Sequence, residues 1–80
     1  MPVVFRNGGN RFFFFSNEGV PREPIHIHVR GHGARAKFWI NPVAIAENIG
    51  FAAQELNELA RVVGDNAEQI ERAWHEHFGD

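Results

Sequence analysis

Two runs of alternating apolar and polar residues constrain the fold of this chain more than any other feature of its sequence. In residues 25–30, isoleucine and valine alternate with histidine and arginine, and a similar alternation runs through residues 34–40. A period of two is typical of a strand that buries one face. The connection Gly31-His32-Gly33 is short and rich in glycine, so the two runs predict a β-hairpin with one apolar and one polar face.

A second hairpin is predicted nearer the start of the chain. Residues 2–6 contain an apolar run, and residues 11–16 contain four consecutive phenylalanines, which favour a strand covered on both faces. Asparagine and glycine at positions 7–10 supply the positive φ angles that a tight turn needs. Two prolines in residues 17–24 then predict a loop, because proline lacks a backbone donor and keeps the preceding residue out of the helical region.

The remaining residues, 42–80, are predicted to be helical. An Asn-Pro pair suits the cap and the first position of a helix, which favours a short helical turn over residues 42–48. Apolar residues three and four positions apart then predict an amphipathic helix that starts near Ala52 and is interrupted at Gly64.

A second helix is predicted to follow, with Asp65 and Asn66 as candidate caps in a capping-box pattern and Gly79 as its end. Two helices joined by a tight turn are expected to pack on the apolar side of the sheet. The predicted fold is a single α+β domain over residues 1–80. In it, two β-hairpins in residues 1–40 form a small antiparallel sheet, and two C-terminal helices pack on it.

Composition and charge exclude several classes of protein. The chain has no cysteine, which excludes disulfide bonds and cysteine-based zinc sites. It has no apolar run near the roughly 18 residues that span a bilayer, and its start lacks the apolar core of a signal peptide, so a cytoplasmic protein without a membrane partner is expected. Residues 1–37 hold six basic and two acidic residues, whereas residues 38–80 hold two basic and eight acidic ones. This asymmetry indicates either a basic surface that meets an anion or two halves that each solvate their own surface.

The polar face of the second hairpin is the first candidate site. Its residues combine phosphate donors, histidines and an aromatic ring, and they are His26, His28, Arg30, Arg35, Lys37 and Trp39. Metal-independent RNA cleavage needs a general base and a general acid, roles that suit the two histidines, while the basic side chains hold phosphate. Trp39 is either a stacking platform or is covered by residues 42–50. The same face is also explained as a solvated strand face whose charges discourage aggregation.

A metal site is the first alternative. His26 and His28 are two residues apart on a strand, so their rings point the same way, which suits two ligands of zinc or another divalent transition metal. His32, in the turn, is the candidate third ligand. The basic residues on the same face repel a cation, which argues against a metal site. The nucleic-acid hypothesis itself includes no cofactor. His75 and His77 do not form a pair, because two residues on a helix are about 200° apart around its axis.

A protein-interaction module without catalysis is the second alternative. A basic sheet beside acidic helices makes a bipolar surface, and such surfaces dock partners of either sign. The phenylalanine run is apolar on both faces, which leaves one face for the core and one for a partner or a homo-oligomer.

The chain resembles a family of small bacterial proteins described as a domain of unknown function. The family carries a Pro-Pro-His-x-His-Val/Ala motif, which corresponds here to residues 24–29, with Ile25 in place of the second proline. Further matches are Met1-Pro2-Val3-Val4, Phe13-Phe14-Phe15-Ser16-Asn17-Glu18-Gly19, Ala36-Lys37-Phe38-Trp39, Pro42-Val43, Gly50-Phe51, Glu55-Leu56 and Trp74. Ala52 stands where a serine cap is common in the family.

The resemblance implies a genetic setting rather than an activity. Genes of the family often lie beside those of another small uncharacterised family, in suspected toxin–antitoxin pairs. It therefore implies an RNA-directed toxin or a protein that binds a small cognate partner, in preference to a metabolic enzyme. It implies no catalytic residues, so the roles given to His26 and His28 rest on their own chemistry.

Overall fold

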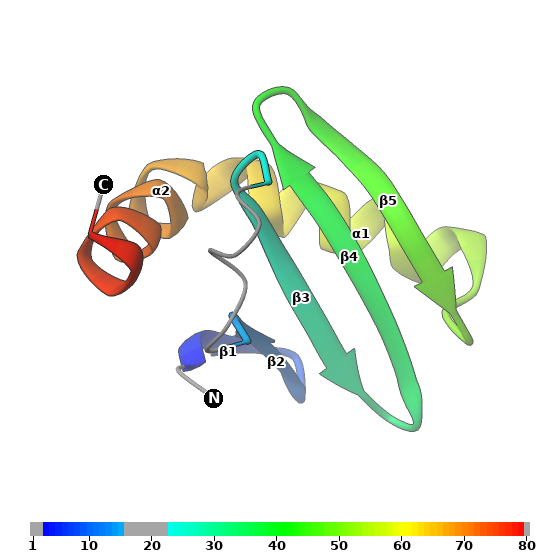
Figure 1. The fold of residues 1–80 in the computed structure, drawn as a ribbon. Helices are drawn as coiled ribbons and strands as arrows, with labels where there is room; N and C mark the ends of the chain where they lie inside the picture. The colour runs from blue at the N-terminus through cyan, green and yellow to red at the C-terminus, as the bar shows by residue number, and fades with distance from the viewer. Residues whose placement is uncertain (1–2, 16–22, 80) are drawn as a thin grey trace.

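The computed structural model describes residues 3–15 and 23–79, and these form a five-stranded antiparallel sheet followed by two helices (Figure 1). The elements are β1 (Val3–Asn7), β2 (Asn10–Phe13), β3 (His26–Gly31), β4 (Ala34–Ile40), β5 (Val43–Ile49), α1 (Ala53–Asp65) and α2 (Ala67–Phe78). The sheet order follows the chain, β1-β2-β3-β4-β5. The predicted α+β fold is therefore confirmed, and both predicted hairpins form. The strand predicted over residues 11–16 is shorter than expected, because β2 ends at Phe13. The loop predicted over residues 17–24 lies, up to residue 22, outside the described residues.

Residues 42–48, predicted as a short helical turn, form the edge strand β5 instead. Asn41 and Pro42 make the turn between β4 and β5, and the two strands pair antiparallel along their length. Two causes act together. β5 contains the β-branched residues Val43, Ile45 and Ile49, which favour strands, and the free edge of β4 offers unpaired backbone groups. Local capping chemistry is thus overridden by cross-strand pairing, and the helical part begins only at Ala53.

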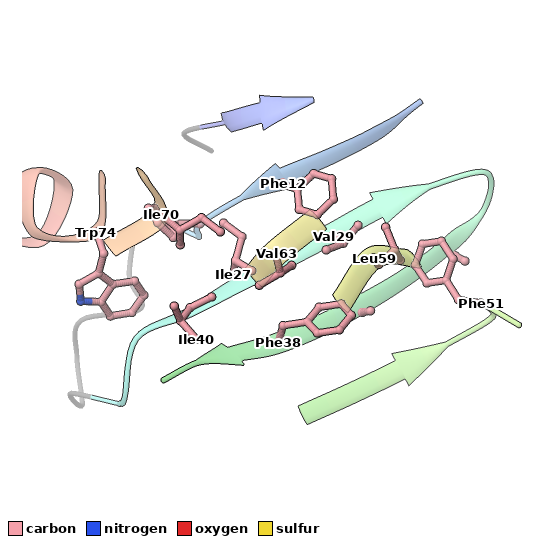
Figure 2. Packing of buried hydrophobic residues seen from close by; sticks show 13 residues of the cluster. Phe12, Ile27, Val29, Phe38, Ile40, Phe51, Leu59, Val63, Ile70 and Trp74 are labelled. Carbon is pink, nitrogen blue, oxygen red and sulfur yellow. The ribbon is translucent and has the colours of Figure 1, made fainter. Parts of the chain in front are cut away.

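The hydrophobic core lies between one face of the sheet and the helices (Figure 2). The sheet contributes Phe12, Ile27, Val29, Phe38 and Ile40, the segment before α1 contributes Phe51, and the helices contribute Leu59, Val63, Ile70 and Trp74. We call this side of the sheet the helix side and the opposite side the open face. The alternation along each strand, which predicted one apolar face, is what assigns side chains to the two sides.

The two helices cover different parts of the helix side. Helix α1 packs across β4 and β5, whereas α2 lies beyond the end of the sheet where β3 begins (Figure 1). Trp74 of α2 is buried there, edge-to-face with Phe14 at a ring-centroid distance of 5.3 Å. Burial of these large rings removes much apolar area from water, which a chain of this size needs for stability.

The junction between the helices differs from the prediction. Gly64 does not interrupt the first helix, which continues to Asp65. Asn66 makes no side-chain cap for α2. Its Nδ2 donates instead to the carbonyl oxygen of Val62 at 2.8 Å, which satisfies the end of α1. At the start of α1, the backbone N–H of Ala52 donates to Glu55 Oε1 at 3.0 Å, so this helix begins without the serine cap.

Neither helix offers a membrane span: within residues 3–15 and 23–79, no helix combines the length and the apolar character that crossing a bilayer requires.

Substitution of the paired residues Phe38 and Ile45 compares the stability contributed by a core position with that contributed by a position on the sheet edge. The two residues are Cα partners on β4 and β5, but Phe38 is fully buried and Ile45 is 48% exposed. We expect Phe38→Ala to lower the free energy of unfolding by about 3–5 kcal/mol, because it leaves a cavity. We expect Ile45→Ala to cost less than about 1 kcal/mol, because half of its side chain stays in water. Urea unfolding checks both, and equal losses would contradict this description of the core.

Candidate nucleic-acid interface

Four arginines form one row across the open face. Arg6 is the Cα partner of Arg11, Arg11 of Arg30, and Arg30 of Arg35, on the consecutive strands β1 to β4. We call these four residues the arginine row. Directly opposed side chains on neighbouring strands have Cβ atoms about 5 Å apart. The row therefore concentrates four positive charges along a line that crosses the strands.

The arginine row has no acidic partner in the part of the chain that the structure describes. None of its members makes an ion pair with a described residue. Instead, Arg30 lies over the ring of Phe13, with Cζ 5.9 Å from the ring centroid, a cation–π contact. Like charges placed directly opposite each other destabilise a sheet. An anion bound across the row would remove this repulsion.

An open cleft of about 700 Å³ is lined by the arginine row and by Gly9, His32 and Gly33 of the two hairpin turns. His32 and Gly33 form the tight turn of the second hairpin and both have positive φ, 52° and 79°, as its geometry requires. The His32 ring lies so close to Gly9 that a Cβ there would be 2.9 Å from Nε2. This contact holds the two turns side by side.

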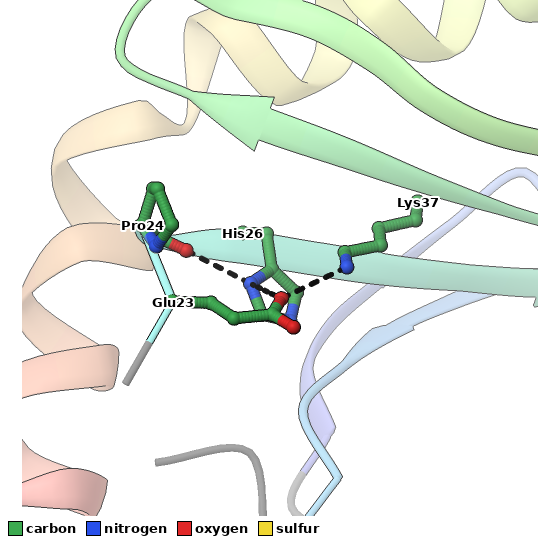
Figure 3. A network of polar contacts seen from close by, with 4 residues as sticks. All are labelled: Glu23, Pro24, His26 and Lys37. Atoms are coloured by element: carbon green, nitrogen blue, oxygen red, sulfur yellow. Dashed lines mark hydrogen bonds and ion pairs between the residues drawn. The ribbon is translucent and has the colours of Figure 1, made fainter. Parts of the chain in front are cut away.

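His26 is buried, unlike the other polar residues of β3. It is 1% exposed, and Nδ1–H donates to the Pro24 carbonyl oxygen at 2.9 Å (Figure 3). Its ring lies edge-to-face with those of Trp74, at 5.0 Å, and Trp39, at 5.6 Å. A general acid or base must reach the reacting oxygen. The burial of this ring therefore favours a structural role for His26 over the predicted catalytic one.

The side chains of Lys37 and Trp39 contact each other. Lys37 Nζ lies 4.6 Å from the centroid of the Trp39 ring. The same Nζ donates to Glu23 Oε1 at 3.0 Å (Figure 3). Trp39 is half-buried and is not covered by β5, whose Ala44 is its Cα partner. Its ring remains a candidate stacking surface, but a base would compete with the lysine for it.

The three histidines of the predicted metal site are not brought together. The rings of His26 and His28 are 5.2 Å apart, but His32 lies at the far end of β3, where Nε2 is 3.4 Å from the Gly8 carbonyl oxygen. Within residues 3–15 and 23–79, no group of three or more histidine, cysteine, aspartate or glutamate side chains is placed to hold a metal ion. The donor set of the metal alternative is thus split between the two ends of a strand.

Two residues of the arginine row were missed by the sequence-based prediction. Arg30 and Arg35 were predicted to hold phosphate, and the structure adds Arg6 and Arg11 from the first hairpin. A signal was present, because both residues directly flank the predicted turn at positions 7–10 and a tight turn makes such residues cross-strand partners. The pairing of β2 with β3, which joins the two hairpins into one row, has no comparable local signal.

Substitution of the two histidines distinguishes a structural role of His26 from a catalytic one. We expect His26→Ala to lower the free energy of unfolding by about 2–4 kcal/mol, because it removes a buried ring and leaves the Pro24 carbonyl without its donor. His28, which is half-buried, is the matched control, and His28→Ala should cost about 1 kcal/mol. Chemical denaturation measures both values. A loss below that of His28→Ala would show that the His26 ring is dispensable for folding.

Comparison with known proteins gives a family without a stated activity. No curated protein and no solved structure matches the chain. A family model with the description "Domain of unknown function (DUF4160)" matches residues 9–75, which include β2 to β5, α1 and three of the four arginines of the row. The chain belongs to this family of domains of unknown function.

Proposed function

We propose that this protein binds RNA on its open face, with the arginine row holding the phosphate backbone. The observation that carries this proposal is the alignment of Arg6, Arg11, Arg30 and Arg35 on adjacent strands without an acidic partner among the described residues. Arginine presents a planar fork of donors that matches a phosphate group. Neighbouring strands are about 4.8 Å apart, so the row is about 14 Å long and can contact several consecutive phosphates.

The surroundings of the arginine row favour a single strand over a duplex. Away from the row, the open face carries the half-buried aromatic side chains of Phe15 and Trp39, whereas the ring of Phe13 is buried beneath Arg30. Positively charged grooves with adjacent aromatic rings are typical of proteins that bind single-stranded nucleic acids. The paired bases of a duplex would leave these rings unused.

The proposal includes binding but not cleavage. Of the two histidines predicted as acid and base, His26 is buried against Trp74. His28 is half-buried and lies against Phe15 at 4.6 Å, which leaves it as the one predicted catalytic side chain near the surface. In a toxin–antitoxin pair, the setting that the resemblance implies, such a protein would act by occupying an RNA or by delivering it to its partner.

Pairing of a protein partner with the edge strand β5 is the weaker alternative. β5 exposes Ile45 and Ile49, by 48% and 49%, and a free edge can accept another strand. However, Ile45 lies opposite Phe38 on the helix side and Ile49 lies opposite Arg35 on the open face. The two side chains therefore do not form one apolar patch, and an irregularity in the β4–β5 pairing further interrupts the edge.

Removal of single arginines tests the proposal directly. We expect Arg11→Ala or Arg35→Ala to weaken binding of a fluorescent single-stranded RNA by about 3- to 30-fold at low salt. Each substitution should also lower the slope of log affinity against log salt by about one, because one fewer counterion is released. Arg72→Ala, on the exposed surface of α2, is the control and should change neither value. Equal losses of affinity for Arg72→Ala and Arg35→Ala would show that RNA binding depends on the overall charge of the protein and not on the arginine row.

Polyphosphate should stabilise the folded protein through the same row. A ligand that binds only the native state raises its stability by mass action, and here it also removes repulsion between guanidinium groups. We expect millimolar tripolyphosphate to raise the melting temperature of the natural protein by several degrees and that of an Arg11→Ala, Arg35→Ala double variant by clearly less. Differential scanning fluorimetry at fixed ionic strength is the measurement, and identical shifts would contradict the proposal.

A further inference from the structure

A smaller pocket lies beside the arginine row. We call it the Glu47 pocket; its volume is about 110 Å³. The side chains that matter for its chemistry are two guanidinium groups, three aromatic rings and one carboxylate, and they belong to Arg30, Arg35, Phe13, Phe15, His28 and Glu47. Of the described residues that line the two pockets on the open face, Glu47 is the acidic one.

Glu47 is not neutralised by its cross-strand neighbour. Lys37 is the Cα partner of Glu47, but Lys37 Nζ donates to Glu23 at 3.0 Å instead. Over residues 3–15 and 23–79, the Glu47 carboxylate takes part in no ion pair or side-chain hydrogen bond. A carboxylate at this position repels phosphate and so weakens a site made only for the backbone. Its chemistry is suited to a group that donates a hydrogen bond.

The position and size of the Glu47 pocket fit a base that belongs to a bound phosphate. Arg30 and Arg35 of the row line one side of the pocket, and His28, which precedes Arg30 by two residues on β3, lines it about 6–7 Å further along the strand. This spacing is comparable with the distance between a phosphate and the base of the same nucleotide. The volume suits one pyrimidine ring and excludes a base pair.

We propose that the Glu47 pocket holds one unstacked base and selects cytosine over uracil. This inference rests on the proposed function and names its preferred ligand. The Glu47 carboxylate accepts a hydrogen bond from the amino group of cytosine, as acidic side chains do when they read this base. A guanidinium of Arg30 or Arg35 donates to the adjacent ring nitrogen or carbonyl oxygen. Uracil carries a carbonyl oxygen in place of the amino group, and two oxygens then face each other without a proton.

Binding of two short RNAs of equal length and charge tests the inference. Fluorescence anisotropy is measured with six-nucleotide oligocytidine and oligouridine at neutral pH, for the natural protein and for Glu47→Ala. Glu47 is exposed on an edge strand, so the variant should keep the melting temperature of the natural protein, which is checked. Glu58→Ala, on the exposed surface of α1, removes the same charge away from the open face.

We expect the natural protein to bind oligocytidine about 5- to 50-fold more tightly than oligouridine. Glu47→Ala should reduce this ratio to near one, and it should raise the affinity for oligouridine because a negative charge has been removed. Glu58→Ala should keep the ratio of the natural protein.

Two results would overturn the inference while leaving the proposed function intact. One is salt-dependent binding of both RNAs with equal affinity by the natural protein. The other is a cytosine preference that persists in Glu47→Ala, which would place base recognition elsewhere. Failure of the natural protein to bind either RNA at low salt would overturn the inference and the proposed function together.

Discussion

The register of the central strands is the constraint on which the open face depends. Because side chains alternate between the two sides of a strand, a slip of one residue in any of these strands would move the arginine of that strand to the helix side. The buried residues on the helix side prevent this. Phe12 and Val29 are Cα partners, as are Val29 and Ala36, and all three are buried beneath the helices. The apolar pairs thus hold in register the arginine pairs that lie next to them along the strands.

In this arrangement, the residues that stabilise the fold and the residues of the proposed binding surface lie on opposite sides of the sheet. The core uses the helix side, and burial of its aromatic and branched side chains is the main favourable term in folding. The open face can therefore carry the like-charge pairs Arg11–Arg30 and Arg30–Arg35, although such pairs destabilise a sheet by themselves. The cost is tolerable because it falls on partly exposed side chains, where water and salt screen the charges. Under the proposed function, a bound polyanion would relieve the same repulsion, and this relief would add to the binding free energy.

How far the sequence predicts this structure differs from element to element. The hairpins over residues 25–40 and near the start of the chain were predicted because alternation and turn chemistry act between neighbours in sequence. β5 was missed because Asn-Pro suits a turn as well as a helix start, and only the free edge of β4 decides between them. Of the four residues of the arginine row, two were predicted from the sequence. Arg30 and Arg35 share one hairpin, whereas their alignment with Arg11 depends on the β2–β3 pairing across a long connection.

His26 illustrates why residue type alone does not define a site. Both histidines of the His-x-His pair occupy the same side of β3, and their chemistry was equally suited to proton transfer. Their surroundings differ because α2 lies near the end of the sheet where β3 begins (Figure 1). There, Trp74 of α2 packs against His26. The same strand therefore begins in a buried aromatic cluster and ends in the arginine row. The cluster fixes the start of β3, and through the strand it fixes where Arg30 stands relative to Arg11 and Arg35. A residue that was predicted to react is thus better explained as one that holds the open face in place.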